Sequence, residues 1–301
     1  MKFQVIGHKW WFLSVSGILV AASIILIATY GFSFGIDFSG GTLWQASFEK
    51  GVSRDELVEF FAATPDLSGA AVTEEGEAGS GVFFLRTPEL SEVRHQEVAA
   101  ALTEKFGAFE ELGFQTIGSS IGSELRGKAV TAFLMVLLGI SVYIAFAFRK
   151  VSRQVSSWKY GIITLATLFH DALIPAGLFA LLGHLRGVEV DTNFIVAILV
   201  VLGFSVHDTI VVFDRIRENL RVSDAARSDF GELVNRSVNQ TMARSVNTSL
   251  TLILVLIALY FFGAPNLKYF VLTIGIGTIV GTYSSIFVAS PLLALWRKRE
   301  Q

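Results

Sequence analysis

The sequence predicts a mainly α-helical membrane protein, in which a six-helix transmembrane bundle carries one extracytoplasmic α+β domain. Hydrophobic residues make up 52% of the 301 residues and charged residues only 17%, proportions that exclude an ordinary soluble protein. Six apolar stretches are long enough to cross about 30 Å of hydrocarbon as helices. Between the first two stretches the pattern changes to the short periodicities of a soluble domain, which predicts the added α+β domain.

The six predicted spans begin with a retained anchor near the N-terminus. They are Trp10–Tyr30, Ala129–Phe148, Trp158–Leu182, Asn193–Phe213, Thr248–Phe262 and Tyr269–Trp296. The first has a longer apolar run than a signal peptide, and no clean small-x-small cleavage site follows it. The chain is thus divided into residues 1–30 with the first span, residues 31–127 as the outer domain, and residues 128–301 with five spans. The last region includes a cytoplasmic segment, residues 214–247, and a short basic tail.

The distribution of Lys and Arg predicts the orientation. Of the 24 basic residues, 15 lie in the N-terminus, the loop after the second span, the segment after the fourth span and the tail. In a six-span chain these segments share one face, and cytoplasmic loops are the ones enriched in Lys and Arg. We therefore expect both termini in the cytoplasm. The opposite segment, residues 31–127, has 16 acidic and 6 basic residues, which suits a solvated domain outside the membrane.

The periodicities within residues 31–127 predict four strands and two helices. The strands are expected at Thr42–Phe48, Ala70–Thr73, Gly81–Leu85 and Phe109–Thr116, and the helices from Ser53 onward and over Ser91–Phe106. Ser53, with Glu56 three residues later, has the pattern of a capping box, and residues 75–80 form a turn-rich link between the middle strands. The order β-α-β-β-α-β is that of a ferredoxin-like split βαβ sandwich.

Two aspartates lie inside predicted spans, each directly preceded by a histidine: His170-Asp171 in the third span and His207-Asp208 in the fourth. A charged side chain at this depth is disfavoured by about 2.5–3.5 kcal/mol on insertion scales, so it persists where it is paired, solvated or used. For Asp208 the pattern favours a role in ion transport. For Asp171 a transport role and a structural role, in which the carboxylate bridges two helices, both stay open.

Helix geometry places Ser205, Asp208 and Thr209 on one face of the fourth span, whereas His207 points about 100° away. Each histidine is interpreted first as a hydrogen-bonding neighbour of its aspartate. His-Asp doublets lack the spacing of metal ligands and the chain has no cysteine, so no metal site is predicted. Arg244, at the entry to the fifth span, is the natural counter-charge for Asp208, although its position alone indicates a positive-inside anchor.

Glycines mark both junctions between the outer domain and the spans, among them Gly40, Gly41 and Gly122. The simpler interpretation is turn formation at a domain boundary. The alternative is a pair of hinges that let the outer domain swing. Glycine alone does not distinguish a bend from a pivot.

Four motifs, which follow one another along nearly the whole chain, resemble the SecD/SecF family of bacterial protein-export proteins. They are Gly35–Thr42, which includes Asp37, Ile121–Leu125, His170-Asp171 and Asp208–Asn219. The resemblance implies kinship with RND exporters. The six-span bundle would correspond to half of the membrane domain of such an exporter. It also implies that the proton-coupling aspartate of the family is Asp208 and its membrane-entry arginine is Arg244. The family usually has Asn before that aspartate, whereas this chain has His207, a second titratable group that would shift the working pH.

The resemblance further implies an accessory, non-enzymatic subunit of the Sec pathway in the bacterial cytoplasmic (inner) membrane. The expected partners are SecD, the SecYEG channel, the SecA motor, the translocating unfolded polypeptide and membrane lipid, without nucleic acid or cofactor. The predicted function is to use the proton-motive force to move the outer domain and so promote completion of translocation. Protonation of Asp208 from the outside would release Arg244 and repack the helices.

Two alternatives remain open at this point. One is half of an RND-type exporter of small molecules or lipids, which would require a substrate pocket inside the membrane. The other is a structural assembly subunit, which would tolerate Asp208→Asn.

Overall fold

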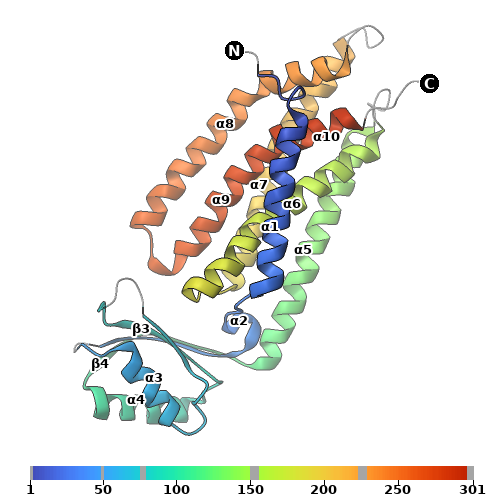
Figure 1. Ribbon diagram of the computed structural model, residues 1–301. Coiled ribbons are helices and arrows are strands. Elements are labelled where there is room, and N and C mark those ends of the chain that lie inside the picture. Colours follow the sequence, from blue (N-terminus) through green and yellow to red (C-terminus); the bar gives the residue numbers. More distant parts are fainter. Residues whose placement is uncertain (1–2, 49–50, 75–78, 150–155, 223–228, 297–301) are drawn as a thin grey trace. The chain divides into compact units, whose positions relative to one another are not determined.

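The computed structural model describes residues 3–48, 51–74, 79–149, 156–222 and 229–296. The chain forms two compact units (Figure 1). The helical unit comprises Met1–Phe32, Thr131–Val188 and Asn193–Gln301, and the sheet unit comprises Ser33–Val130 with the short loop Glu189–Thr192. Several predictions concern residues outside the described ones: the turn at 75–78 and the cations Lys2, Lys150, Arg153, Arg227, Arg297, Lys298 and Arg299.

Six helices in the described part of the chain are long and apolar enough to span a membrane, in the predicted order. They are α1 (Lys9–Tyr30), α5 (Ser119–Ala147), α6 (Ser157–Arg186), α7 (Thr192–Val222), α8 (Phe230–Phe262) and a last span over Lys268–Leu295. Helices α6, α7 and the last span bury about half of their apolar windows inside the chain, whereas α1, α5 and α8 leave most of theirs exposed. The first three therefore form the centre of the bundle, and the others present apolar side chains that suit lipid or a partner.

The last span changes its helical geometry in the middle. It consists of α9 (Lys268–Ser284), a single π-helical turn η3 (Ser285–Ala289) and α10 (Ser290–Leu295). Isolated π turns within α-helices are frequent at functional sites because they shift the direction of the side chains that follow. Helix α9 packs against both α6 and α8, so this turn lies in the middle of the bundle.

Two helices begin earlier than the sequence predicts. Helix α5 begins at Ser119 rather than Ala129, so Gly122 lies within a helix and not in a junction loop. An ion pair of 2.7 Å between Glu124 and Lys128, one turn apart, supports this added segment. Helix α8 begins at Phe230, long before the predicted span, and Asp229 caps it by accepting a hydrogen bond from the Gly231 amide.

The sheet unit has the predicted order of strands and helices. After the short helix α2 (Ile36–Ser39) come β1 (Gly41–Phe48), α3 (Arg54–Ala63), β2 (Ala71–Glu74), β3 (Val82–Thr87), α4 (Glu92–Phe106) and β4 (Phe109–Ile117). The strands pair antiparallel in the order β2-β3-β1-β4. The capping box is confirmed: the Ser53 hydroxyl accepts from the Glu56 amide, and the Glu56 carboxylate accepts from the Ser53 amide at 2.8 Å. Trp44, Phe83 and other fully buried side chains form the core between sheet and helices.

Candidate ion-coupling site in the helix bundle

Asp171 lies on α6 at the centre of the bundle and is fully buried. Its Oδ2 accepts hydrogen bonds from Ser205 Oγ of α7 at 2.5 Å and from Ser284 Oγ of α9 at 2.7 Å. Its Oδ1 lies 2.8 Å from Nδ1 of the adjacent His170, which is also buried. The carboxylate thus connects three helices through hydroxyl groups. Such donors compensate part of the cost of holding a charge away from water.

Asp208 lies on α7 and is almost as enclosed, with 2% of its surface exposed. Its Oδ2 accepts a hydrogen bond of 3.3 Å from Thr282 Oγ1 of α9, which itself lies 2.5 Å from Ser249 Oγ of α8. Ser245 of α8 brings its hydroxyl near the same carboxylate, without the geometry of a hydrogen bond. Asp208 is therefore held by longer contacts than Asp171, and it is the easier of the two to rearrange.

One short segment of the last span contacts both carboxylates. Thr282 binds Asp208 and Ser284 binds Asp171, while Ser285 Oγ lies 2.8 Å from Thr209 Oγ1. The segment fits because Gly281 has no side chain: a Cβ there would lie 2.8 Å from the Cβ of Ser205. The backbone of α9 can consequently approach α7 closely about one turn before the π-helical turn begins. Any sliding of α9 against α7 would change the hydrogen bonds of both carboxylates together.

His207 is exposed on the surface of the helical unit, whereas Asp208, the next residue, is enclosed. This difference confirms the predicted rotation of about 100° between them. His207 is therefore not a hydrogen-bonding neighbour of the carboxylate in the way that His170 is.

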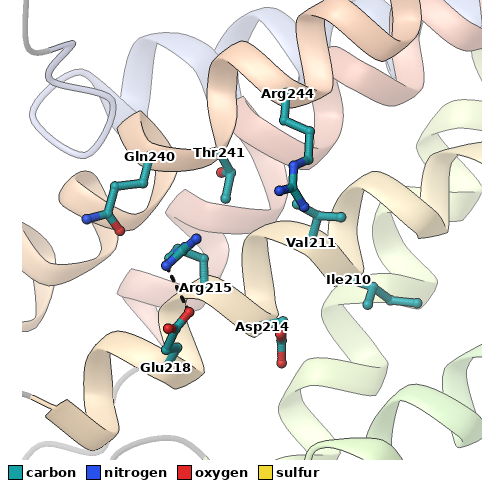
Figure 2. A pocket seen from close by; sticks show the side chains of 8 residues that line it. All are labelled: Ile210, Val211, Asp214, Arg215, Glu218, Gln240, Thr241 and Arg244. Carbon is teal, nitrogen blue, oxygen red and sulfur yellow. Dashed lines mark hydrogen bonds and ion pairs between the residues drawn. The ribbon is translucent and has the colours of Figure 1, made fainter.

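A polar pocket of about 190 Å³ lies between α7 and α8, one helical turn beyond Asp208 (Figure 2). It is lined by Ile210, Val211, Asp214, Arg215, Glu218, Gln240, Thr241 and Arg244. Arg244 extends from α8 toward Val211, and Arg215 donates a hydrogen bond of 2.8 Å to Glu218 on its own helix. The volume is sufficient for several water molecules, and the lining is polar enough to hold them.

The predicted pairing of Arg244 with Asp208 is not present in this structure. Among the described residues, no ion pair within 4.0 Å joins the two side chains. Arg244 is exposed and faces the pocket, whereas Asp208 faces the hydroxyl groups of α9. Arg244 thus lines the polar pocket, and hydroxyl groups surround the carboxylate of Asp208.

The junction residues singled out in the sequence lie together in the sheet unit. Asp37 Oδ2 accepts a hydrogen bond of 2.8 Å from the backbone amide of Thr192. Gly40 and Gly41 have φ values of +75° and +115°, which disfavour other residues. A Cβ on Gly122 would lie 2.9 Å from the Gly40 amide nitrogen, so the first turns of α5 pack directly on this backbone. These glycines permit close contacts, and their role as hinges stays a prediction.

Sequence reasoning did not find Ser245, Ser249, Thr282 and Ser284. Thr278 and Thr282, and likewise Ser245 and Ser249, are spaced four apart inside apolar runs, which places each pair on one helix face. This repeat is the signal that was available. It is a weak one, because Ser and Thr within helices often bond only to the carbonyl four residues earlier.

Comparison with known proteins identifies the family. The model of the C-terminal part of the protein export membrane proteins SecD/SecF matches residues 97–299, and the model of the SecD/SecF GG motif matches residues 25–52. The chain belongs to the SecD/SecF family. Protein translocase subunit SecF of Thermobaculum terrenum is 43% identical over 99% of this chain and 95% of its own length. The corresponding subunit of Synechocystis sp. is 38% identical over 94% of this chain and 91% of its own length.

Solved structures of SecDF confirm the fold. The crystal structure of SecDF from Thermus thermophilus aligns with a TM-score of 0.86 at 35% identity, over 98% of this chain and 39% of that chain. A super-membrane-facing form of SecDF aligns over the same share with a TM-score of 0.69. The chain is thus a multi-pass membrane protein of a transport family and not an enzyme, and it corresponds to a little over a third of the longer SecDF.

Proposed function

We propose that this chain is an accessory subunit of the Sec protein-export translocase, which uses the proton-motive force to promote completion of translocation. The observation that carries the proposal is the pair of enclosed carboxylates, Asp171 and Asp208, bound by hydroxyl groups of neighbouring helices within the spans. Ionisable groups are rare at this depth, and those that face the interior of a bundle commonly mark ion pathways or proton relays. The names of the relatives, protein translocase subunit SecF, supply the class of cargo.

The proposed orientation places both termini in the cytoplasm and the sheet unit outside. At one end of the spans lie Lys9, Lys159 and the arginines of the α7 and α8 extensions, and at the other lie Arg126, Lys128, Arg186 and Lys268. The excess of cations marks the cytoplasmic end. The pocket that holds Arg244 then lies on the cytoplasmic side of Asp208.

In the proposed cycle a proton from the outside neutralises Asp208 and weakens its hold on Thr282. The contact between α9 and α7 then changes, and through it the hydrogen bonds of Asp171. The proton leaves through the pocket, where the positive charge of Arg244 favours the deprotonated carboxylate. Separation of Arg244 from Asp208, as in this structure, is the arrangement expected when Asp208 is neutral. His207, exposed beside Asp208, is placed to exchange protons with a neighbouring partner or with water.

The proposed partners follow from the family. The Thermus thermophilus relative is named SecDF, and this chain matches 39% of its length, so we assign the remaining part to a separate SecD. The SecYEG channel, the SecA motor and the emerging unfolded polypeptide complete the proposed assembly. The super-membrane-facing form of SecDF supports a cycle with more than one conformation.

Export of a secreted precursor into inverted membrane vesicles tests the proposal, with and without an imposed proton gradient. The variants are Asp208→Asn and Arg244→Met, compared with wild type at matched subunit levels. Glu232→Gln is the matched control, because Glu232 is an exposed acidic residue on α8, away from the pocket. We expect Asp208→Asn and Arg244→Met to abolish only the gradient-stimulated part of export and Glu232→Gln to leave it unchanged. Full stimulation in Asp208→Asn would refute proton coupling at this residue and favour a structural assembly role.

A further inference from the structure

The loop between α6 and α7 is part of the sheet unit, although both helices are spans of the helical unit. Residues Glu189–Thr192 group with Ser33–Val130, whereas the residues on either side belong to the helical unit. The chain therefore passes between the two units at four places, and two of these are the adjoining ends of α6 and α7. These are the helices that carry Asp171 and Asp208. The contacts of this loop determine how closely those helix ends follow the sheet unit.

The backbone of the loop pairs with the segment that precedes α2. Val190 accepts a hydrogen bond of 2.9 Å from the Gly35 amide and donates one of 2.7 Å to the Ser33 carbonyl. Phe34 and Val190 form an isolated parallel bridge between these segments. Gly35 lets Glu189 approach closely, since a Cβ at this position would lie 3.1 Å from Glu189 Oε2. The loop is thus held by a single β-bridge to Ser33–Gly35, the first residues of the sheet unit.

Asp37 adds a charged contact at the beginning of α7. Thr192 is the first residue of that helix, and its amide donates to Asp37 Oδ2 at 2.8 Å. The first amides of a helix have no partner within the helix, and a carboxylate there also interacts favourably with the helix dipole. Asp37 therefore serves as an N-terminal cap contributed by a distant part of the sequence. The capped helix is the one that carries Ser205 and Asp208.

Glu189 and Arg86 form the third contact. Arg86, on β3, makes an ion pair with Glu189, and the two side chains are only 27% and 17% exposed. Burial raises the pKa of Glu189 to about 7, opposed by the Arg86 guanidinium and assisted by the carboxylates of Asp191 and Asp37. Removing either partner would leave the other charge half-buried and unpaired, which is destabilising.

We propose that the contacts of Glu189–Thr192 with Asp37 and Arg86 form a clasp. In it, Asp37 and Glu189 are positioning residues that tie the ends of α6 and α7 to the sheet unit. Motion of the helices that carry Asp171 and Asp208 is then transmitted directly to the sheet, with the clasp closed throughout. The inference rests on the proposed function, because it assigns the route by which ion binding moves the sheet unit. It gives Asp37 a mechanical role that a hinge would not provide.

The test uses the same export assay and full-length protein with its partners. Asp37→Ala and Glu189→Gln are compared with Asp55→Asn, an acidic residue of the sheet unit whose side chain is 94% exposed. We expect gradient-independent export to be unchanged in all three. The gradient-stimulated part should fall by about fivefold in Asp37→Ala, the shift in a two-state equilibrium expected from loss of one helix cap, and should stay at the wild-type level in Asp55→Asn.

A disulfide provides the decisive arm, because the chain has no native cysteine. Phe34→Cys and Val190→Cys would link the two bridged residues and lock the clasp. We expect the lock to leave wild-type stimulation intact and to restore stimulation to Asp37→Ala until a reductant is added. Loss of stimulation in the locked wild type, or full stimulation in Asp37→Ala without the lock, would overturn the clasp. Asp208→Asn is assayed in parallel. If this variant keeps full gradient stimulation, the proposed function fails. If Asp208→Asn loses the stimulation and Asp37→Ala keeps it, only the clasp fails.

Discussion

Two glycine substitutions on α9 test the close contact that brings the last span to both carboxylates. In Gly281→Ala the added Cβ would lie 2.8 Å from Ser205 Cβ and 3.3 Å from Ser205 Cα and Oγ. Ordinary contacts begin near 3.4 Å, so α9 or α7 must move by roughly half an ångström. In the matched control, Gly275→Ala, the nearest atom is Leu256 Cδ1 at 4.0 Å, and nothing has to move. Both changes gain the same helix propensity, about 1 kcal/mol, which cancels in the comparison.

Overpacking of this size costs about 1–3 kcal/mol. We therefore expect Gly281→Ala to unfold with a free energy about 1–3 kcal/mol lower than Gly275→Ala. The assay is denaturant titration of the purified protein in mixed micelles, followed by circular dichroism. The displaced Ser205 should also lengthen its 2.5 Å bond to Asp171, so gradient-stimulated export should fall in Gly281→Ala alone. Equal stability of the two variants would refute the close approach of α9 to α7.

Three further predictions concern the sheet unit and the N-terminus. Ser91 caps α4 by accepting a hydrogen bond from the Arg94 amide. In thermal unfolding, Ser91→Ala should therefore destabilise the sheet unit by about 1 kcal/mol and Ser91→Gly by only a few tenths of a kcal/mol. An equal loss of stability in the two variants would exclude the cap. The pKa of Glu189 in the folded protein, about 7, exceeds its ordinary value of 4.5, so between pH 4.5 and about 7 the folded protein keeps a proton that the unfolded chain loses. The free energy of unfolding of wild type should therefore fall relative to that of Glu189→Gln as pH rises from 4.5 to about 7, and stay constant above that pH. A difference between the two proteins that does not vary with pH would contradict the raised pKa. Asn239 exchanges two hydrogen bonds of 2.8 Å with the Phe3 backbone, so Asn239→Ala should speed limited proteolysis of the N-terminus, and an unchanged rate would count against that contact.

Local signals in the sequence predicted most of the sheet unit and the order of the spans. Ser53 and Glu56 marked the start of α3, and alternation marked each strand, because both signals depend on residues close together in the chain. The early start of α5 was missed for the opposite reason. The segment from Gly118 to Gly127 has the composition of a turn. It is helical from Ser119 onward, where Gly122 packs on Gly40, a residue far away in the sequence. Composition alone does not contain that information.

The candidate site shows the same difference between local sequence signals and contacts made by residues far apart in the chain. Asp171 and Asp208 were found because a charge within an apolar run is rare. Their hydroxyl partners were missed because Thr164 and Thr167 have the same pattern as Thr282 and yet bond to carbonyls of their own helix. Only the packing of three helices distinguishes a hydroxyl group that binds a carboxylate from one that does not. The position of Arg244, beside the pocket and apart from Asp208, likewise depends on side-chain direction.

The energy available from one proton is comparable to that of the hydrogen bonds by which hydroxyl groups hold these carboxylates. One charge crossing 100 mV supplies about 2.3 kcal/mol. Interhelical hydrogen bonds within membranes average about 0.6 kcal/mol each, and three of them, from Ser205, Ser284 and Thr282, hold Asp171 and Asp208. Breaking all three therefore requires about 2 kcal/mol, which a single proton provides. The network of hydroxyl groups around the two carboxylates is therefore weak enough to respond to each proton.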